Sequence, residues 1–247
     1  MPPLSKFSQI GLRQPYGSPI SYESLTEAIR DITLREGAKV VDFGCGNGES
    51  LLTVCGNLET SGLVALGVDL SPEMIAWANE LKKHGFPAEF RCEDASLAVT
   101  REAPYDLMLC IGASHCRGSY HQALETASQN LNHGGYVLMG EGYWKRQPSK
   151  EYLDFLGATE DEMGSHFSNE EAGVAAGLVP ILSLTSTDRE WDEFEGRYSH
   201  NIERFCLENP SDPDVPAFRE RIRKWRRMYR EHGRDTLGFA LYLFLKV

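Results

Sequence analysis

The chain lacks an apolar run of the length that a membrane helix requires. No stretch approaches the roughly 20 uninterrupted apolar residues that cross a bilayer. The first residues, Met-Pro-Pro-Leu-Ser-Lys, also lack the basic-then-apolar layout of a secretory signal. We therefore expect a cytoplasmic protein that makes no membrane contact. With 247 residues, 41% of them hydrophobic and 25% charged, the composition is globular and excludes a disordered or fibrous chain.

Closely spaced cysteines are also lacking. The six cysteines are scattered singly, with no C-x-x-C pair and no Cys/His cluster at the spacing of zinc ligands. This distribution favours reduced, mostly buried thiols and predicts no metal site.

Basic residues are outnumbered, 25 Lys and Arg against 36 Asp and Glu, which gives a net charge of −11. Such a surface repels phosphate backbones and makes nucleic acid an unlikely partner. One exception is residues 219–230, which hold seven basic residues and one acidic residue. We interpret this run as an amphipathic helix whose basic side pairs with the acidic segment 188–195, and a contact with an anionic substrate or RNA is the alternative.

Short β-rich runs alternate with helical patterns along most of the chain. The predicted strands are 39–43, 63–69, 88–92, 105–111, 135–140, 178–184 and 239–245, and the predicted helices are 21–36, 47–55, 72–84 and 119–131. Strands separated by single helices form right-handed βαβ units. We therefore predict an α/β, Rossmann-like, mostly parallel seven-stranded sheet with helices on both faces.

The alternation breaks after residue 140. Residues 141–178 contain two short helical candidates, and 188–235 contain two more helices broken at 209–213. We predict a helical cap inserted around strands five to seven of a single domain, because no linker is long enough to separate independent domains. The predicted division of residues 1–247 is a cofactor-binding core at about 36–140, cap segments at 141–178 and 188–235, and a last strand at 237–247.

A glycine-rich turn follows the first predicted strand. It reads Asp42-Phe43-Gly44-Cys45-Gly46-Asn47-Gly48-Glu49 and leads into a helix. Glycines allow a sharp turn and let a ligand lie against bare backbone at a helix N-terminus. The dinucleotide fingerprint G-x-G-x-x-G would require glycine where this chain has Glu49, so a pyrophosphate ligand is disfavoured.

Acidic residues follow the next two strands. Asp69 lies 21 residues beyond Gly48, at the end of the second predicted strand. A carboxylate there can accept both ribose hydroxyls of a nucleoside that lies across neighbouring strand ends. Asp94 follows the third strand and is suited to accept from an adenine amino group. With Asp42, these acids fit a cationic nucleoside better than a nucleotide.

These motifs resemble a known family. Asp42 to Gly48, Asp69 and Asp94-Ala95 match in order and spacing the cofactor motifs of class I S-adenosylmethionine-dependent methyltransferases. Further on, Gly140-Glu141-Gly142-Tyr143-Trp144, with stretches at 190–195 and 207–210, resembles the YjhP-like group of uncharacterised bacterial methyltransferases. The resemblance implies methyl transfer from S-adenosylmethionine but no particular substrate. We expect the acceptor to be a small-molecule nucleophile, and we expect the cap segments to cover its site.

The resemblance also implies a role for each residue of the cofactor motifs. The three loop glycines line the methionine portion, with Cys45 and Asn47 between them, and the glycines are Gly44, Gly46 and Gly48. Asp42 orders either the loop or the amino group of the methionine portion. The nucleoside is held at the ribose by Asp69 and at the adenine by Leu70, Asp94 and Ala95. Backbone at Ile111 and Gly112 meets the methionine ammonium group. Cys45 as a catalytic thiol is a second interpretation.

Candidate catalytic residues follow the fourth and fifth strands. His115 is the best general base because an unperturbed imidazole titrates near neutrality, although a positioning or capping role is the alternative. Glu141 could bind a cationic substrate group or cap the next turn. Tyr143 could wall the acceptor site or pack between core and cap. Two other functions stay open at this point, an NAD(P)-dependent oxidoreductase and a noncatalytic S-adenosylmethionine-binding protein.

Overall fold

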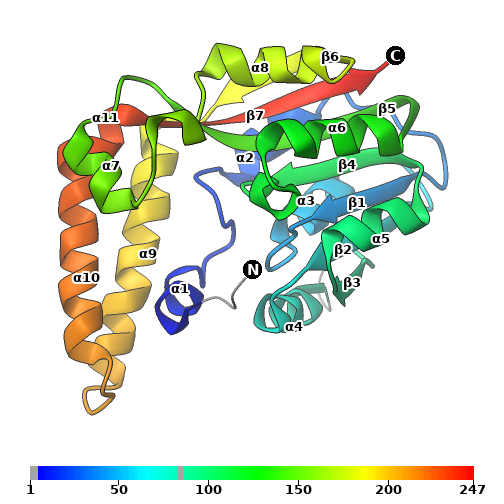
Figure 1. The fold of residues 1–247 in the computed structure, drawn as a ribbon. Helices are drawn as coiled ribbons and strands as arrows, with labels where there is room; N and C mark the ends of the chain where they lie inside the picture. The colour runs from blue at the N-terminus through cyan, green and yellow to red at the C-terminus, as the bar shows by residue number, and fades with distance from the viewer. Residues whose placement is uncertain (1–4, 83–85) are drawn as a thin grey trace.

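A computed structural model describes residues 5–82 and 86–247. The described chain forms one seven-stranded sheet in the order β3-β2-β1-β4-β5-β7-β6 (Figure 1). Strands β1 to β5 are parallel, and β7 runs antiparallel to both β5 and β6. The strands are β1 (Lys39–Phe43), β2 (Val64–Asp69), β3 (Glu89–Cys92), β4 (Tyr105–Ile111), β5 (Leu131–Trp144), β6 (Leu178–Thr185) and β7 (Leu237–Lys246). The mostly parallel seven-stranded sheet predicted from the sequence is confirmed.

Helices cover both faces of this sheet. Helices α2, α3 and α4 pack on one side of the strands, and α5, α6 and α8 pack on the other (Figure 1). The helices are α1 (Lys6–Gly11), α2 (Tyr22–Ile29), α3 (Glu49–Asn57), α4 (Pro72–Leu81), α5 (Ala95–Glu102), α6 (Tyr120–Asn130), α7 (Lys150–Leu156), α8 (His166–Ala175), α9 (Asp188–Glu208), α10 (Val215–Met228) and α11 (Arg234–Thr236). Shorter turns are the 3₁₀ turns Ser114–Arg117 and Glu160–Glu162 and the π-helical turn Tyr229–Gly233. None of these described helices is both long and apolar enough to span a bilayer.

Helix starts follow ordinary capping chemistry. Ser71 caps α4 by accepting a hydrogen bond from the Met74 amide at 3.3 Å, and Pro72 occupies the first helical position. At α9, Thr187 and Glu190 form a reciprocal capping box. These caps place the start of α4 directly after β2, where Asp69 ends the strand.

Strand β7 lies inside the sheet, as its apolar character on both faces predicts. Its residues from Phe239 to Phe244 are all buried, between β5 and β6. Both sheet faces therefore contribute to two large hydrophobic clusters, one on each side.

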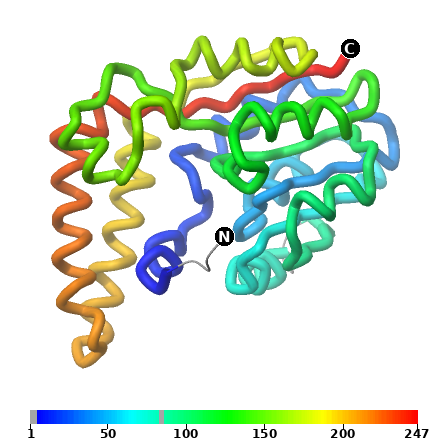
Figure 2. The backbone as a smooth tube through the Cα atoms, viewed as in Figure 1, coloured from blue at the N-terminus to red at the C-terminus, as the bar shows by residue number. Residues whose placement is uncertain are grey.

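The predicted cap contains a long helical hairpin made of α9 and α10. This hairpin projects from the edge of the molecule beside α1, as Figure 2 shows. A third hydrophobic cluster joins the three helices through Phe7, Ile202 and Ile222, among others. At the hairpin tip, the Lys6 ammonium pairs with the carboxylates of Asp212, at 2.7 Å, and Asp214, at 2.8 Å. The first helix is thus held by residues about 200 positions away.

Several predicted elements differ in extent from the observed ones. The helix expected over 21–36 ends at Ile29, and the strand expected over 135–140 extends from Leu131 to Trp144. Helix α5 was not predicted, because its eight residues follow β3 with only a short apolar pattern. The end of the helix predicted over 72–84 falls partly outside the described residues.

Candidate functional site

The glycine loop after β1 has a backbone that only glycine adopts easily. Gly44, Gly46 and Gly48 have φ values of +80°, +53° and +78°. A side chain would also lack room, because a Cβ on Gly48 would lie 2.5 Å from the Phe90 ring and one on Gly44 would overlap Ala113. The loop therefore keeps its shape through both conformation and packing.

Asp69 braces this loop from the neighbouring strand. Its Oδ2 accepts a hydrogen bond from the Gly46 amide at 2.9 Å, and its Oδ1 accepts one from the Ser71 amide at 2.8 Å. Each carboxylate oxygen can accept more than one hydrogen bond, so both remain able to accept from a ligand. Asp69 therefore holds the glycine loop in place and can still accept hydrogen bonds from a ligand.

A cavity of about 250 Å³ opens at the carboxyl ends of β1, β2 and β4. Ligands of open α/β sheets characteristically bind outside these strand ends. The predicted cofactor residues that line it are Asp42, Gly44, Cys45, Gly46, Asn47, Asp69, Leu70, Asp94, Ala95, Ile111 and Gly112. Gly48 is the one predicted cofactor residue that does not line it, because it turns towards Phe90 and Ala78 beneath the loop. Eleven of the twelve residues that the family resemblance implies for the cofactor thus line one cavity.

Acidic side chains dominate the charge of this cavity. Asp42, Asp69, Glu93 and Asp94 line it, and the described lining contains neither lysine nor arginine. Asp94 also caps α5 by accepting a hydrogen bond from the Ser96 amide at 2.7 Å, and the Ser96 side chain together with this amide lowers the pKa of Asp94. The combination suits a ligand that carries positive charge and hydroxyl or amino donors rather than phosphate.

Asp42 is the most strongly perturbed of these acids. Its side chain is 2% exposed, and Oδ1 has no hydrogen-bond partner in the structure. Burial, with a smaller contribution from the charge of Asp69, raises the pKa of Asp42 to about 7. A buried carboxylate oxygen without a partner fits a cationic group entering from the cavity.

Two thiols also line the cavity. Burial, followed by the charges of Asp42 and Asp69, raises the pKa of Cys45, so this thiol is neutral and unsuited to nucleophilic catalysis. Cys116 differs in direction, because its interaction with the neighbouring Cys110 thiol lowers the pKa of Cys116.

The three predicted catalytic residues occupy different surroundings. His115 lies in the 3₁₀ turn after β4, lines the cavity, is exposed, and has no side-chain hydrogen bond with any described residue. Glu141 and Tyr143, on β5, do not line the cavity. Glu141 Oε1 accepts a hydrogen bond from the Gly142 amide at 3.1 Å, Oε2 has no hydrogen-bond partner among the described residues, and burial raises the pKa of the carboxyl. Its capping interpretation therefore fits better than a direct substrate contact.

Tyr143 is part of the core beneath the cap. Its ring is 8% exposed and packs edge-on against His166 at a centroid distance of 5.4 Å. The unexpected length of β5 carries this side chain past the cavity, so the packing interpretation replaces that of an acceptor wall.

The N-terminal segment supplies cavity residues that the sequence did not reveal. The lining includes four residues of this segment, Leu12, Gly17, Ser18 and Ile20. The Asn47 side-chain amide attaches this segment by donating to the Gln14 carbonyl at 3.0 Å and to the Pro15 carbonyl at 2.8 Å. No local signal in residues 5–20 points to this role, because it depends on contacts distant in sequence.

The two predicted cap segments do not reach the cavity directly. No residue of 141–178 or 188–235 is among its lining residues within the described chain. Instead, Asn201 of α9 donates its side-chain amide to the Gly11 carbonyl at 3.2 Å and to the Arg13 carbonyl at 2.8 Å. The α9–α10 hairpin thus holds in place residues 12–20, which we call the N-terminal cover. This corrects the expectation that the cap segments themselves cover the acceptor site.

The comparisons with known proteins agree with this geometry. A model of the methyltransferase domain family matches residues 34–231. Uncharacterized protein YjhP of Escherichia coli (strain K12) is 24% identical over 238 residues, which cover 92% of each chain. A solved S-adenosylmethionine-dependent methyltransferase from Geobacter sulfurreducens, in complex with S-adenosylhomocysteine, has a TM-score of 0.87 at 23% identity over 100% of both chains. The solved structure of YjhP has a TM-score of 0.84 at 21% identity, covering 98% of this chain and 99% of that one.

The sheet order and the family match define a class I S-adenosylmethionine-dependent methyltransferase fold and enzyme class. The chain belongs to the methyltransferase domain family. This membership replaces the oxidoreductase alternative, and the resemblance to the YjhP-like group is confirmed.

Proposed function

We propose that this enzyme transfers a methyl group from S-adenosylmethionine to a nucleophilic atom of a small molecule. The observation that carries the choice of a small molecule is the cover over the cavity. Leu12, Gly17, Ser18 and Ile20 close one side of a space of about 250 Å³. A polymeric acceptor would have to displace this segment, which Asn47 ties to the glycine loop.

The cofactor fits the residues present at the cavity. Asp42 offers its unpartnered carboxylate oxygen to the methionine ammonium, and Asp69 accepts from the ribose hydroxyls. Leu70 is 48% exposed although it is apolar, which suits it to pack on the adenine ring. Asp94 and Ala95 border the adenine edge, and the loop backbone borders the methionine chain.

S-Adenosylmethionine supplies an activated methyl group whose transfer removes the positive charge of the sulfonium. The chain's own task is to align the acceptor and keep the cavity dry. His115 faces this cavity and is exposed enough to pass a proton to solvent, so it is suited to deprotonate a hydroxyl or thiol acceptor. The neutral Cys45 contributes to the wall.

The acceptor is found by an unbiased search for methylated products. The enzyme is incubated with a cell extract and S-adenosylmethionine labelled in the methyl group, and small molecules and polymers are analysed separately by mass spectrometry. We expect label in a small molecule only when enzyme and cofactor are both present. Label confined to protein or nucleic acid would contradict a small-molecule acceptor, and adenosylhomocysteine binding without any product would favour a noncatalytic binding protein.

A further inference from the structure

A second cavity lies between α9 and the end of α10, and it shares no lining residue with the cofactor cavity. Its volume is about 630 Å³. On one side the cavity is lined by Glu195, Gly196 and Ser199 of α9. On the other side it is lined by Arg226 of α10 and by Arg230 of the turn that follows α10. The basic run at 219–230, which methyl transfer does not use, thus contributes two guanidinium groups to a concave site.

The floor of this cavity contains an unsatisfied polar group. Ser199 is 5% exposed, and its Oγ has no hydrogen-bond partner among residues 5–82 and 86–247. An unpartnered buried hydroxyl destabilises the folded chain unless a ligand or water satisfies it. Beside it, a Cβ on Gly196 would meet no atom within 4 Å, so the helix surface leaves open space at this point.

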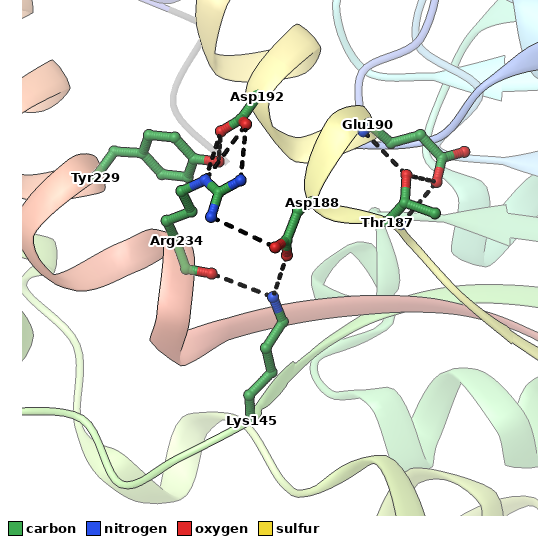
Figure 3. A network of polar contacts seen from close by, with 7 residues as sticks. All are labelled: Lys145, Thr187, Asp188, Glu190, Asp192, Tyr229 and Arg234. Atoms are coloured by element: carbon green, nitrogen blue, oxygen red, sulfur yellow. Dashed lines mark hydrogen bonds and ion pairs between the residues drawn. The ribbon is translucent and has the colours of Figure 1, made fainter.

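Most of the acids around the cavity already have partners. Figure 3 shows Asp192 held by Arg234, with an Nε–Oδ1 distance of 3.0 Å, and by the Tyr229 hydroxyl at 2.9 Å. Arg234 also pairs with Asp188, which Lys145 contacts from the loop after β5. This corrects the expected pairing of the acidic segment, since the main cation opposite it is Arg234 rather than the run at 219–230.

Glu195 is the remaining buried acid of the cavity. It accepts a hydrogen bond from the Trp225 indole N–H at 2.6 Å, and burial raises its pKa to about 7. Its negative charge near neutral pH is therefore incomplete, which reduces its repulsion of an anion.

The two arginines at the rim are left with unused donors. Arg226 lies 4.0 Å from Glu203 without a hydrogen bond, and Arg230 forms neither an ion pair nor a side-chain hydrogen bond within the described chain. Arg230 also lies in the π-helical turn Tyr229–Gly233, a rare conformation that is frequent at functional sites. Guanidinium groups bind carboxylate and phosphate oxygens in a two-pronged geometry.

We propose that this cavity binds the oxyanion group of a small molecule, a phosphoryl or carboxyl group, through Arg226, Arg230 and the Ser199 hydroxyl. The concave shape and the buried hydroxyl favour a small ligand over RNA, whose approach the net charge of −11 also opposes. This cavity is separate from the one proposed for the cofactor and the methyl acceptor. The molecule bound here would be a regulator of the enzyme or a second portion of a substrate that contacts the hairpin.

The test is a titration of the full chain with inorganic phosphate and, separately, with succinate at low ionic strength, followed by calorimetry. We expect saturable binding of at least one probe, and the tighter probe identifies the source of the oxyanion. Arg230→Gln should weaken binding about 10-fold or more, and Ser199→Ala about 3-fold to 10-fold. Adenosylhomocysteine affinity should stay unchanged, which verifies that each variant is folded.

Arg227→Gln is the matched control, because Arg227 carries the same charge on the same helix but pairs with Glu231 and does not line the cavity. It should change binding less than about 2-fold. Equal losses in Arg227→Gln and Arg230→Gln, or no saturation by either probe, would overturn the proposal. Tight binding of a short single-stranded RNA that weakens equally in both variants would also overturn it in favour of an extended basic surface.

Discussion

The strand ends proposed to bind the cofactor and the N-terminal segment beside them are positioned in different ways. Asp42 and Asp69 lie at the carboxyl ends of β1 and β2, and Asp94 follows β3, so the parallel strands bring the three acids together. The N-terminal segment instead depends on α9, whose Asn201 donates to the carbonyls of Gly11 and Arg13 about 190 residues earlier. The acidic side of the cavity therefore depends on short-range patterns in the sequence, whereas the N-terminal side depends on long-range packing.

The largest expected effect concerns His115, the residue proposed to deprotonate the acceptor. His115→Gln should lower kcat by about 10²–10⁴ if the acceptor is a hydroxyl or thiol with a pKa above neutrality, because proton removal is then lost. Cofactor affinity should be unchanged. The measurement is the pH dependence of kcat for both proteins with the identified acceptor.

A wild-type pH profile retained in His115→Gln would rule out the role of base. Full activity of the variant would instead indicate an acceptor that needs no deprotonation, such as an anion or a neutral amine.

The next largest effect concerns Asp69, at the carboxyl end of β2. Asp69→Ala removes two charge-assisted contacts to the ribose and should weaken adenosylhomocysteine binding by about 2–4 kcal/mol. The variant should also be less stable than the wild type, because Asp69 braces the Gly46 and Ser71 amides.

Calorimetry measures the affinity, and urea unfolding measures the free energy of unfolding. Asp235→Ala, at an exposed position outside the cavity, serves as the control. Wild-type affinity in folded Asp69→Ala would defeat the ribose assignment.

A third prediction concerns the hydrogen bonds that join Asn47 of the glycine loop to the N-terminal segment. Asn47→Ala removes the two hydrogen bonds to the Gln14 and Pro15 carbonyls, which frees the segment at 12–20. We expect binding of adenosylhomocysteine to weaken by about 1–3 kcal/mol and amide exchange in this segment to accelerate.

Asn79→Ala is the matched control, since the Asn79 amide bonds only to Ile75 within its own helix. Equal behaviour of the two variants would show that the link between loop and segment does not contribute to binding.

The smallest expected effect is a pH dependence of adenosylhomocysteine affinity that arises from the ionisation of Asp42. Its pKa is raised to about 7 in the folded protein, so the carboxyl is mostly protonated at pH 6 and mostly ionised at pH 8. If a cationic ligand group binds the ionised form, affinity for adenosylhomocysteine should rise about 10-fold between these values. Asp42→Asn should flatten this profile, and an unchanged slope in the variant would assign the titration to another group.

The same group makes a prediction about stability. A carboxyl whose pKa is raised by folding favours the folded state below its unfolded pKa, near 4, and this contribution is lost as the pH rises through about 7. The free energy of unfolding of the wild type should therefore fall over this range relative to that of Asp42→Asn.

The sequence predicted the sheet because strand and helix patterns are short-range, and the resemblance to a known family supplied most of the residues proposed for the cofactor. Neither predicted that Asp69 would brace the glycine loop, since the donor is the Gly46 backbone amide, whose position depends on the loop's φ values. For Tyr143 the sequence left two interpretations open, an acceptor wall and core packing, because nothing local reveals that β5 continues to Trp144. The cover was missed for a similar reason, since Leu12 and Ile20 become cavity residues only through contacts with distant elements.

The most direct test of the account is hydrogen exchange of the full chain with and without adenosylhomocysteine. We predict slower exchange in residues 42–48 and in 12–20, because ligand binding would order the edge and its cover together. Residues 215–228 of α10, which do not line the cavity, should exchange at unchanged rates. Protection of the hairpin without protection of 12–20 would contradict the account and restore the hairpin as the cover.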